Sequence, residues 1–381
     1  MNVIICNSCI NGKGGGERAI LEIAKKFNAK IYTAYYDKLG TYPEFSDFEV
    51  RQIHPSFFEL PLSFAARIDP DSRMVEAVEA GFRFASIKIK EDYDVLNPHS
   101  FPCEFVAFRN ERVSWYCHSP SRGAYDLHQH YLSQRGLVGK LSLKVATAAN
   151  KALDGWAVKK IDTICANSEI VAKRINKYLN RYDVEVIHPG VDASKFECRS
   201  YSKFFFYPSR FIPEKRQDYA IEAFRLSGLK GWKLVFAGYL PNTARCANYL
   251  TSLKKQATGL NVEFVLCPSD AKMRELYSDC YATLFCGIDE DWGLIPLESM
   301  ASYKPIISVN EGGPTISVLD GKTGFLVNSP AQMAEKMRIL ASNPDACEKM
   351  GKVGRVHVEK NYTWKTFISK IEKVFRKTAK S

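Results

Sequence analysis

Short apolar runs alternate with segments of helical periodicity along the whole chain. Each run has the length and composition of a buried strand, and the segment after it carries apolar residues at every third or fourth position. Because parallel strands need a crossover connection, this alternation predicts parallel sheets with helices on both faces. Six strands are predicted in the first half, at residues 3–6, 31–34, 95–97, 113–118, 161–166 and 184–188, and six in the second, at 204–208, 233–237, 262–266, 282–285, 306–309 and 325–327.

Proline and glycine interrupt this pattern at Pro189 and Gly190, which predicts a break between two sheets. A chain of 381 residues usually forms two units of roughly 100 to 200 residues each. We therefore expect an α/β protein with two parallel-sheet domains facing across a cleft, one at residues 1–189 and one at 190–361. The final segment, 362–381, has apolar residues at helical spacing and is expected to pack as a helix.

The composition is typical of a protein in a reducing compartment. Eleven cysteines, an odd number, lie mostly on predicted strands, which favours reduced thiols that fill the core. The first residues read as a strand, without the basic head and cleavage site of a signal peptide, and no run of about 18 apolar residues occurs. Cys6 with Cys9, and His128 with His130 and Asp126, resemble parts of metal sites, but neither group has the second ligand pair that zinc needs. We expect a cytoplasmic enzyme that needs no metal.

Positive charge is concentrated in two segments. The net charge is +11, to which residues 109–160 contribute +6 and residues 351–381 contribute +7. In the first segment, apolar residues recur at helical spacing with lysines around them, at Val138, Leu141, Val145, Ala148, Ala152 and Trp156 and at Lys140, Lys144, Lys151 and Lys159. Such a helix either lies on an anionic membrane or turns its apolar side to the core. No zinc finger, recognition helix or aromatic RNA-binding pattern is present, so nucleic acid is not expected as a partner.

Two glutamates eight positions apart, Glu290 and Glu298, flank a predicted strand-to-helix turn that contains Gly293. Residues 281–285 read as a buried strand, and residues 294–303 have the spacing of a helix. The first turn of a helix has unpaired N–H groups and a partial positive charge, which together bind phosphate. Carboxylates are poor phosphate ligands but good double acceptors for neighbouring sugar hydroxyls. The pattern favours a diphosphate flanked by two polyols, with helix capping as the alternative.

A glycine-rich loop at residues 12–18 follows the first predicted strand and precedes a helix predicted at 19–27. Its glycines let backbone N–H groups approach a phosphate or a polyol. The dinucleotide pattern G-x-G-x-x-G is absent, because the third glycine would fall at Ala19 or Glu17, and no Gly-Lys-Ser or Gly-Lys-Thr closes the loop. The loop therefore disfavours both a dehydrogenase and a P-loop protein.

Charged and histidine side chains follow other predicted strands. His118 ends a strand near Arg122 and Asp126, and Arg210 and Lys215 follow the first strand of the second half. Ligands of open parallel sheets bind beyond the carboxyl ends of the strands, so these residues are expected at a ligand site. The two cations suit a diphosphate leaving group, since Arg offers a planar fork and Lys a mobile point charge. The alternatives are a structural histidine and a solvated pair of cations.

Together these segments resemble the retaining glycosyltransferases of family 4, which have two Rossmann-like domains in the arrangement called GT-B. The resemblance covers nearly the whole chain, and its motifs stand in the family's order. They are Gly14-Gly15-Gly16-Glu17-Arg18 for G-G-x-E-R, Ala166-Asn167-Ser168, Pro189-Gly190-Val191-Asp192, Arg210 with Lys215 for R-x4-K, Glu290 with Glu298 for E-x7-E, Gly312-Gly313-Pro314, and Asp320-Gly321-Lys322-Thr323-Gly324-Phe325. No single motif is decisive, but their joint occurrence is specific.

The resemblance implies a role for each matched residue. Arg210 and Lys215 would hold the donor diphosphate, Glu298 the ribose hydroxyls and Glu290 the transferred sugar, with His118 beside the anomeric carbon. The implied catalytic residues are His118, Arg210, Lys215 and Glu290. The implied donor-binding residues are Gly15, Gly16, Ser209, Arg210, Lys215, Cys267, Glu290, Gly293, Leu294, Ile295 and Glu298. The acceptor-side candidates are Arg18, Arg122, Tyr125 and Asp126. The family needs no metal.

The segment from Tyr116 to Asp126 resembles the Y-x-H-T-P-x-R-x-x-W-D motif of mannosyltransferases that use GDP-mannose, with Ser119 and Tyr125 in place of Thr and Trp. It implies transfer of mannose to a saccharide. The basic amphipathic stretch favours a lipid-linked saccharide as the acceptor, with the enzyme at the inner face of a membrane. A UDP-sugar such as UDP-glucose is the alternative donor. Two other classes are a nucleotide-sugar epimerase or phosphorylase and a binding protein without catalysis, which the intact polar motifs disfavour.

Overall fold

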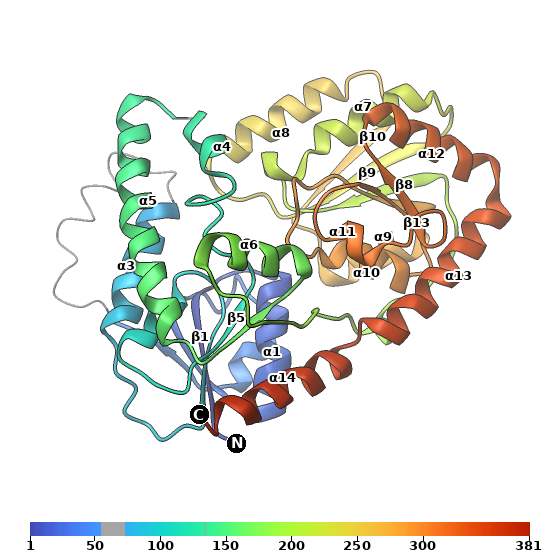
Figure 1. Cartoon of the computed structure of the whole chain (residues 1–381). Helices are drawn as coiled ribbons and strands as arrows, with labels where there is room; N and C mark the ends of the chain where they lie inside the picture. The colour runs from blue at the N-terminus through green and yellow to red at the C-terminus, as the bar shows by residue number, and fades with distance from the viewer. Residues whose placement is uncertain (55–72, 134) are drawn as a thin grey trace. The chain divides into compact units, whose positions relative to one another are not determined.

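The computed structural model describes residues 1–54, 73–133 and 135–381 (Figure 1). The chain divides into two compact units. Unit 1 consists of Met1–His188 and Phe367–Ser381, and unit 2 of Pro189–Thr366. Each unit contains parallel strands and helices, which confirms the predicted α/β class.

Unit 1 contains a parallel sheet with the strand order β3-β2-β1-β4 and a second run with the order β5-β6-β7. A parallel bridge between Leu96 and Val113 joins the two runs at β4 and β5. The strands are β1 (Val3–Ile10), β2 (Lys30–Tyr36), β3 (Val50–Gln52), β4 (Val95–Pro98), β5 (Ser114–Cys117), β6 (Thr163–Ala166) and β7 (Val184–Val186). The helices are α1 (Gly15–Phe27), α3 (Arg73–Ser86), α4 (His128–Ser133), α5 (Leu137–Ala157), α6 (Glu169–Leu179) and α14 (Trp364–Thr378), with 3-10 turns η1 (Pro43–Asp47), η2 (Cys103–Phe108) and η3 (Val158–Lys160).

The C-terminal helix α14 packs on unit 1, beside α1 (Figure 1). The rings of Phe27 and Phe375 lie 5.4 Å apart, and Lys26 forms an ion pair of 3.3 Å with Glu372. Farther along α14, the hydroxyl of Thr378 lies 2.7 Å from that of a threonine on β6. The apolar side predicted for this segment is therefore buried against unit 1, which includes the last 15 residues of the chain.

Unit 2 is a six-stranded parallel sheet with the order β10-β9-β8-β11-β12-β13. Its strands are β8 (Phe204–Pro208), β9 (Lys233–Gly238), β10 (Val262–Leu266), β11 (Ala282–Phe285), β12 (Ile306–Val309) and β13 (Gly324–Val327). Its helices are α7 (Gln217–Ser227), α8 (Ala244–Gln256), α9 (Asp270–Asp279), α10 (Leu294–Ala301), α11 (Pro314–Ser317), α12 (Pro330–Ser342) and α13 (Pro344–Asn361), with 3-10 turns η4 (Ala193–Lys195) and η5 (Pro213–Lys215). Most side chains of the central strands are fully buried, as the apolar runs predicted.

Two differences from the predicted elements concern the first half. The short strand β3 was not predicted, because its three residues carry no apolar alternation. Helix α1 begins at Gly15 rather than at Ala19, because the N–H of Arg18 already donates to the carbonyl of Gly14 at 3.1 Å. Gly15 and Gly16 therefore belong to the first helical turn and not to a loop.

Unit 1 also buries two acids against each other. Glu104 on η2 and Asp154 on α5 are almost fully buried, and Tyr125 donates a hydrogen bond of 2.8 Å to Asp154. Within the described part of the chain, Glu104 Oε2 and Asp154 Oδ1 have no donor. Burial raises the pKa of both acids, to about 6 for Asp154, and the charge of Asp154 raises the pKa of Glu104 further. A proton shared between the two carboxyls satisfies both oxygens.

This shared proton predicts a pH-dependent stability of unit 1. Folding raises the pKa of such an acid. The stability that the acid contributes is fully present at a pH below its pKa in the unfolded chain, and is lost as the pH rises through its pKa in the folded protein. We expect Glu104→Gln to raise the thermal unfolding midpoint near pH 7.5 by about 2 to 4 °C for each kcal/mol gained, because the amide donates to Asp154 without needing a proton. Near pH 5 the gain should shrink. The matched control is Glu111→Gln at an exposed position of the same unit, and an equal loss of stability at both pH values would contradict the shared proton.

Candidate active site

The strand order of unit 2 reverses at β8, whose neighbours are β9 on one side and β11 on the other. Connections to the two neighbours leave toward opposite faces of the sheet, which opens a crevice at the carboxyl ends of these strands. Ser209 and Arg210 directly follow β8, and the loop that contains Glu290 follows β11. Cys267 follows β10, which β9 separates from β8. The predicted donor-binding residues of unit 2 thus share one edge of the sheet, with Cys267 two strands from its centre.

Lys215 and Glu290 form an ion pair at this edge. Lys215 Nζ lies 2.6 Å from Glu290 Oε2, and the side chains are only 12% and 25% exposed. Buried Tyr207 of β8 donates to the carbonyl of Lys215 and accepts from the N–H of Cys286 at 2.9 Å. The hydroxyl of Tyr207 therefore connects the segment that carries Lys215 with the segment that leads to Glu290.

The turn before α10 depends on two glycines of a later loop. Gly312 has φ +60°, and a Cβ there would lie 2.4 Å from the backbone N and O of Glu290. The N–H of Gly313 donates to the carbonyl of Glu290 at 2.7 Å. Buried Trp292 donates from Nε1 to the carbonyl of Pro189 at 3.1 Å. These contacts hold the backbone of Glu290 in place, so the orientation of its carboxylate does not rely on Lys215 alone.

Helix α10 begins with an N-terminus that no side chain caps. Gly293 precedes it with φ +82°, and no acidic residue lies in its first turn. The first N–H groups of a helix lack intrahelical partners, so those of Leu294 and Ile295 are available to an anion. One turn later, Glu298 accepts a hydrogen bond of 2.6 Å from Tyr277. Burial raises the pKa of Glu298, and the bond from Tyr277 opposes that shift.

Two further residues of unit 2 organise this edge and were not predicted. Gln217 is fully buried, and its amide donates to Ser209 Oγ at 2.8 Å and to the carbonyl of Arg210 at 2.9 Å. Arg216 donates to the carbonyl of Cys286 and forms an ion pair of 2.9 Å with Glu311. Gln217 fixes the turn before Arg210, whose own side chain is exposed. A second cation directly after Lys215 was the sequence signal available for Arg216.

Unit 1 has the same reversal of strand order, at β1 between β2 and β4. The glycine-containing start of α1 follows β1, and His118 follows β5. A Cβ on Gly16 would lie 3.7 Å from the imidazole of His118, so these two predicted residues are brought together. His118 Nε2 lies 3.1 Å from Nδ1 of His99, which follows β4 and was not predicted.

A chain of hydrogen bonds determines the tautomer of His118. The amide nitrogen of Asn97 donates to the carbonyl of Ser114 at 2.6 Å, which leaves Asn97 Oδ1 to accept from His99 Nε2 at 2.8 Å. His99 Nδ1 is then an acceptor, so His118 must donate to it from Nε2. Burial lowers the pKa of His118 to about 4, so the ring is neutral near pH 7. His118 therefore offers an unprotonated Nδ1, which accepts but does not donate.

The acceptor-side candidates are engaged within unit 1. Arg122 pairs with Asp126 at 2.9 Å, and Arg174 lies 3.4 Å from the same carboxylate. Tyr125 donates to the buried carboxyl of Asp154, as described above. Arg18 contacts Glu22 at 3.3 Å and Glu44 at 3.1 Å. In this structure these side chains hold loops and helices of unit 1 together.

Helix α5 exposes its apolar stripe. Val138, Leu141, Val145 and Trp156 are 63 to 66% exposed. The buried side of α5 is instead formed by Leu143, Thr147, Asp154 and Ala157. The alternative in which the apolar stripe faces the core is therefore wrong, because a different side of the helix packs on η2 and η3.

The described residues contain neither a membrane-spanning helix nor a metal-type cluster. None of their helices has the length and apolar character needed to cross a membrane. Likewise, no three or more His, Cys, Asp or Glu side chains in these residues are grouped as a metal site would require.

The chain is similar to known glycosyltransferases over nearly its whole length. Residues 13–195 match the family described as glycosyltransferase family 4, and residues 192–357 match that described as glycosyl transferases group 1. The human alpha-1,3/1,6-mannosyltransferase ALG2 is 25% identical over 398 residues, which cover 94% of this chain and 92% of the relative. The protein of the same name from Dictyostelium discoideum is 24% identical and covers 96% of each chain.

Solved structures show the same architecture. Anabaena HepE in complex with UDP and glucose has a TM-score of 0.76 at 15% sequence identity, covering 99% of this chain and 100% of that one. An identity this low supports the fold and no finer statement. The chain is therefore a glycosyltransferase with the GT-B fold, in which a region similar to glycosyltransferase family 4 is followed by one similar to glycosyl transferases group 1.

Proposed function

We propose that the protein is a retaining mannosyltransferase that moves mannose from GDP-mannose onto a saccharide or a lipid-linked saccharide and forms an α-glycosidic bond. The observation that carries the donor side is the Lys215–Glu290 pair, which lies at the strand reversal of unit 2 together with the uncapped start of α10. A cation and free N–H groups suit a diphosphate, and carboxylates suit sugar hydroxyls. Mannose is supported by the names of the two relatives and by the segment from Tyr116 to Asp126.

In this proposal the leaving diphosphate is stabilised by groups that are in place before it leaves. Lys215 has three N–H donors, and its bond to Glu290 leaves others for phosphate oxygens. Arg210 adds a second cation, and the N–H groups of Gly293, Leu294 and Ile295 add fixed dipoles. One well-placed donor of this kind contributes about 3 to 4 kcal/mol to a transition state. Glu298 binds the ribose hydroxyls and Glu290 the transferred sugar.

His118 acts in this proposal as an acceptor for a sugar hydroxyl. A neutral ring with a free Nδ1 accepts a hydrogen bond, and its low pKa makes it a poor proton donor near pH 7. His99 and Asn97 keep the ring in that tautomer. The acceptor attacks from the face that the diphosphate leaves, and a phosphate oxygen takes its proton. No protein nucleophile and no metal take part.

A UDP-sugar donor is the second candidate. The Anabaena HepE structure, which shares the fold, holds UDP and glucose, so the fold accommodates such a donor. The same edge of unit 2 suits either donor, because the diphosphate, ribose and hexose are common to both. The two candidates differ in the base that is bound and in the configuration of the hexose.

On the acceptor side we propose that the exposed stripe of α5 lies on an anionic membrane and presents the enzyme to a lipid-linked saccharide. Four large apolar side chains of the stripe are more than half exposed. Lys144, Lys151 and Lys159 are exposed on α5 and the turn after it, and the acid of this stretch, Asp154, is buried. Apolar insertion and attraction to anionic headgroups add up in such a helix.

The donor assignment predicts a selective thermal shift. GDP and GDP-mannose should raise the unfolding midpoint by several degrees, because a ligand at about 100 times its Kd stabilises the folded state by about 2.7 kcal/mol. Lys215→Ala and Glu298→Gln should each weaken binding roughly 10- to 100-fold, as expected for a lost bond to a charged group. Lys254→Ala at an exposed position is the control. A response to UDP and UDP-glucose alone would overturn the assignment of the donor but not that of the transferase activity. Unchanged binding in both variants would refute the roles assigned to Lys215 and Glu298.

The state of His118 is predicted from its surroundings. NMR of the imidazole nitrogens should find His118 neutral near pH 7, protonated at Nε2, with a titration midpoint of about 4. His118→Asn assigns the resonance. In His99→Ala the Nε2 tautomer should lose its preference, and kcat should fall more than the affinity for the nucleotide. A midpoint near the ordinary histidine value would contradict the acceptor role.

Membrane binding by α5 is predicted to need both the stripe and low salt. The wild-type protein should float with vesicles that contain phosphatidylserine and should dissociate as salt rises. The combined change of Val138, Leu141, Val145 and Trp156 to Ser should abolish flotation without lowering donor binding. The matched control changes Val353 and Val356, which are exposed on α13, to Ser. If the wild-type protein does not float at low salt, the membrane proposal fails.

A further inference from the structure

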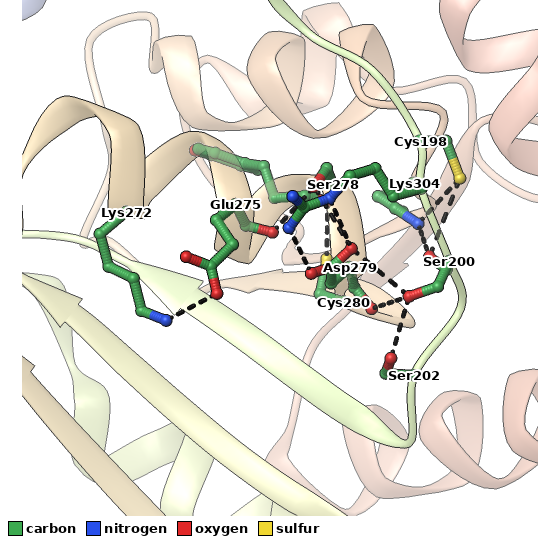
Figure 2. A network of polar contacts seen from close by, with 11 residues as sticks. Cys198, Ser200, Ser202, Lys272, Glu275, Ser278, Asp279, Cys280 and Lys304 are labelled. Carbon is green, nitrogen blue, oxygen red and sulfur yellow. Dashed lines mark hydrogen bonds and ion pairs between the residues drawn. The ribbon is translucent and has the colours of Figure 1, made fainter.

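Unit 2 contains a lysine and a cysteine in direct contact, outside the residues assigned to the donor. Lys304 lies between α10 and β12 and is fully buried, and Cys198 lies between η4 and β8 and is half-buried. Lys304 Nζ is 3.0 Å from Cys198 Sγ and also donates to the carbonyl of Ser200 (Figure 2). The ammonium lies 3.8 Å from the centre of the Tyr201 ring.

The buried ammonium has no carboxylate partner at ion-pair distance among the residues that the structure describes. Asp279, which Figure 2 shows in the same network, is held instead by Arg199 through bonds of 3.1 and 2.6 Å. A buried charge without a counter-ion is strongly unfavourable. Of the two described atoms that accept a hydrogen bond from Lys304 Nζ, Cys198 Sγ can take up a full negative charge, because the other is the carbonyl oxygen of Ser200. A short N–H···S contact is also accepted better by a thiolate than by a thiol.

Other cysteines of the chain have surroundings that make them poor nucleophiles. Burial raises the pKa of the thiols of Cys6, Cys165, Cys280 and Cys286, which keeps them protonated. Cys267 is exposed, but among the described residues no ammonium contacts its sulfur. Cys198 combines partial exposure with a cation on the sulfur, which is the setting of an oxidisable cysteine.

We propose that Cys198 and Lys304 form a reversible sulfur–nitrogen cross-link when the protein meets a peroxide. The thiolate attacks one peroxide oxygen, the O–O bond breaks, and Cys198 becomes a sulfenic acid while the released hydroxide takes a proton from the Lys304 ammonium. The neutral amine, already in contact with the sulfur, then attacks it. The S–O bond breaks, and the leaving hydroxide takes a second proton from nitrogen. One thiolate, one ammonium and one hydrogen peroxide give one sulfenamide and two waters, with sulfur oxidised and peroxide reduced.

The cross-link would join two segments 106 residues apart at the end of α10. Ser299 donates to the carbonyl of Lys304 at 3.0 Å, and Ser302 donates to the carbonyl of Glu298 at 2.8 Å. A bond at Lys304 therefore fixes the C-terminal end of the helix that carries Glu298. Closing a long loop in this way restricts the unfolded chain, so the oxidised protein should unfold at a higher temperature.

The test treats the full chain with one equivalent of hydrogen peroxide and maps its peptides by mass spectrometry without reductant. The expected result is a linked pair of peptides containing Cys198 and Lys304, whose combined mass lacks two hydrogens and has gained no oxygen. A thiol reductant should restore the separate peptides and the original unfolding midpoint. Cys198→Ser should abolish the link, and Cys267→Ser should keep it.

A sulfenic acid at Cys198 that does not react with Lys304 would give a different product. Dimedone reacts with sulfenic acids, so it should label Cys198 only if the amine fails to attack. Labelling of Cys198 with Lys304 unmodified, or oxidation of Cys267 before Cys198, would overturn the cross-link. Neither outcome depends on the donor or on transfer activity, because both are read from the peptides alone.

Discussion

The parallel pairing of β8 with β11 is the constraint on which the donor side depends. β8 is the first strand of its unit and β11 is the fourth. Because these two pair directly, the intervening strands β9 and β10 lie on the opposite side of β8. The two segments that follow β8 and β11 therefore emerge together, and Tyr207 ties them through one hydroxyl. Lys215 and Glu290 are 75 residues apart in the chain and still form a bond of 2.6 Å. In unit 1 the strand order reverses at β1, so that β4 and then β5 lie on one side of it. Gly16, which follows β1, and His118, which follows β5, are thereby brought together.

Charge at this edge is held in place by neutral groups more than by other charges. In unit 2 the backbone of Glu290 is fixed by the Gly312–Gly313 turn and that of Arg210 by the amide of Gln217, while in unit 1 the neutral ring of His118 is held by His99 and Asn97. This arrangement leaves Lys215 with N–H donors that its bond to Glu290 does not use. A site built from mutually saturated ion pairs would have to break them before a ligand could bind. Preorganisation by amide, glycine and neutral histidine avoids that cost.

The sequence was sufficient to predict features that depend on local pattern. Apolar runs predicted the strands within a few residues, and motif spacing placed Lys215 and Glu290 after strands and Glu298 in the helix that follows. What it could not predict depends on contacts made only in three dimensions. Nothing in the residues around His99 or Asn97 indicates that they fix the tautomer of His118, because that role depends on the position of β4 beside β5. The strand β3 has no periodicity of its own and exists because β2 offers it an edge.

Helix α5 illustrates a limit of periodicity that has a physical meaning. Its spacing correctly predicted an amphipathic helix, yet the side that packs inward contains Thr147 and Asp154, while valine, leucine and tryptophan face outward. A carboxyl is costly to bury, and here it is tolerated because Glu104 and Tyr125 supply a shared proton and a hydrogen bond. The polar pair sets the rotation of the helix, and the apolar stripe is left outside as a result. Such an inversion lowers stability in water unless the exposed stripe has an apolar environment of its own, which a bilayer surface provides.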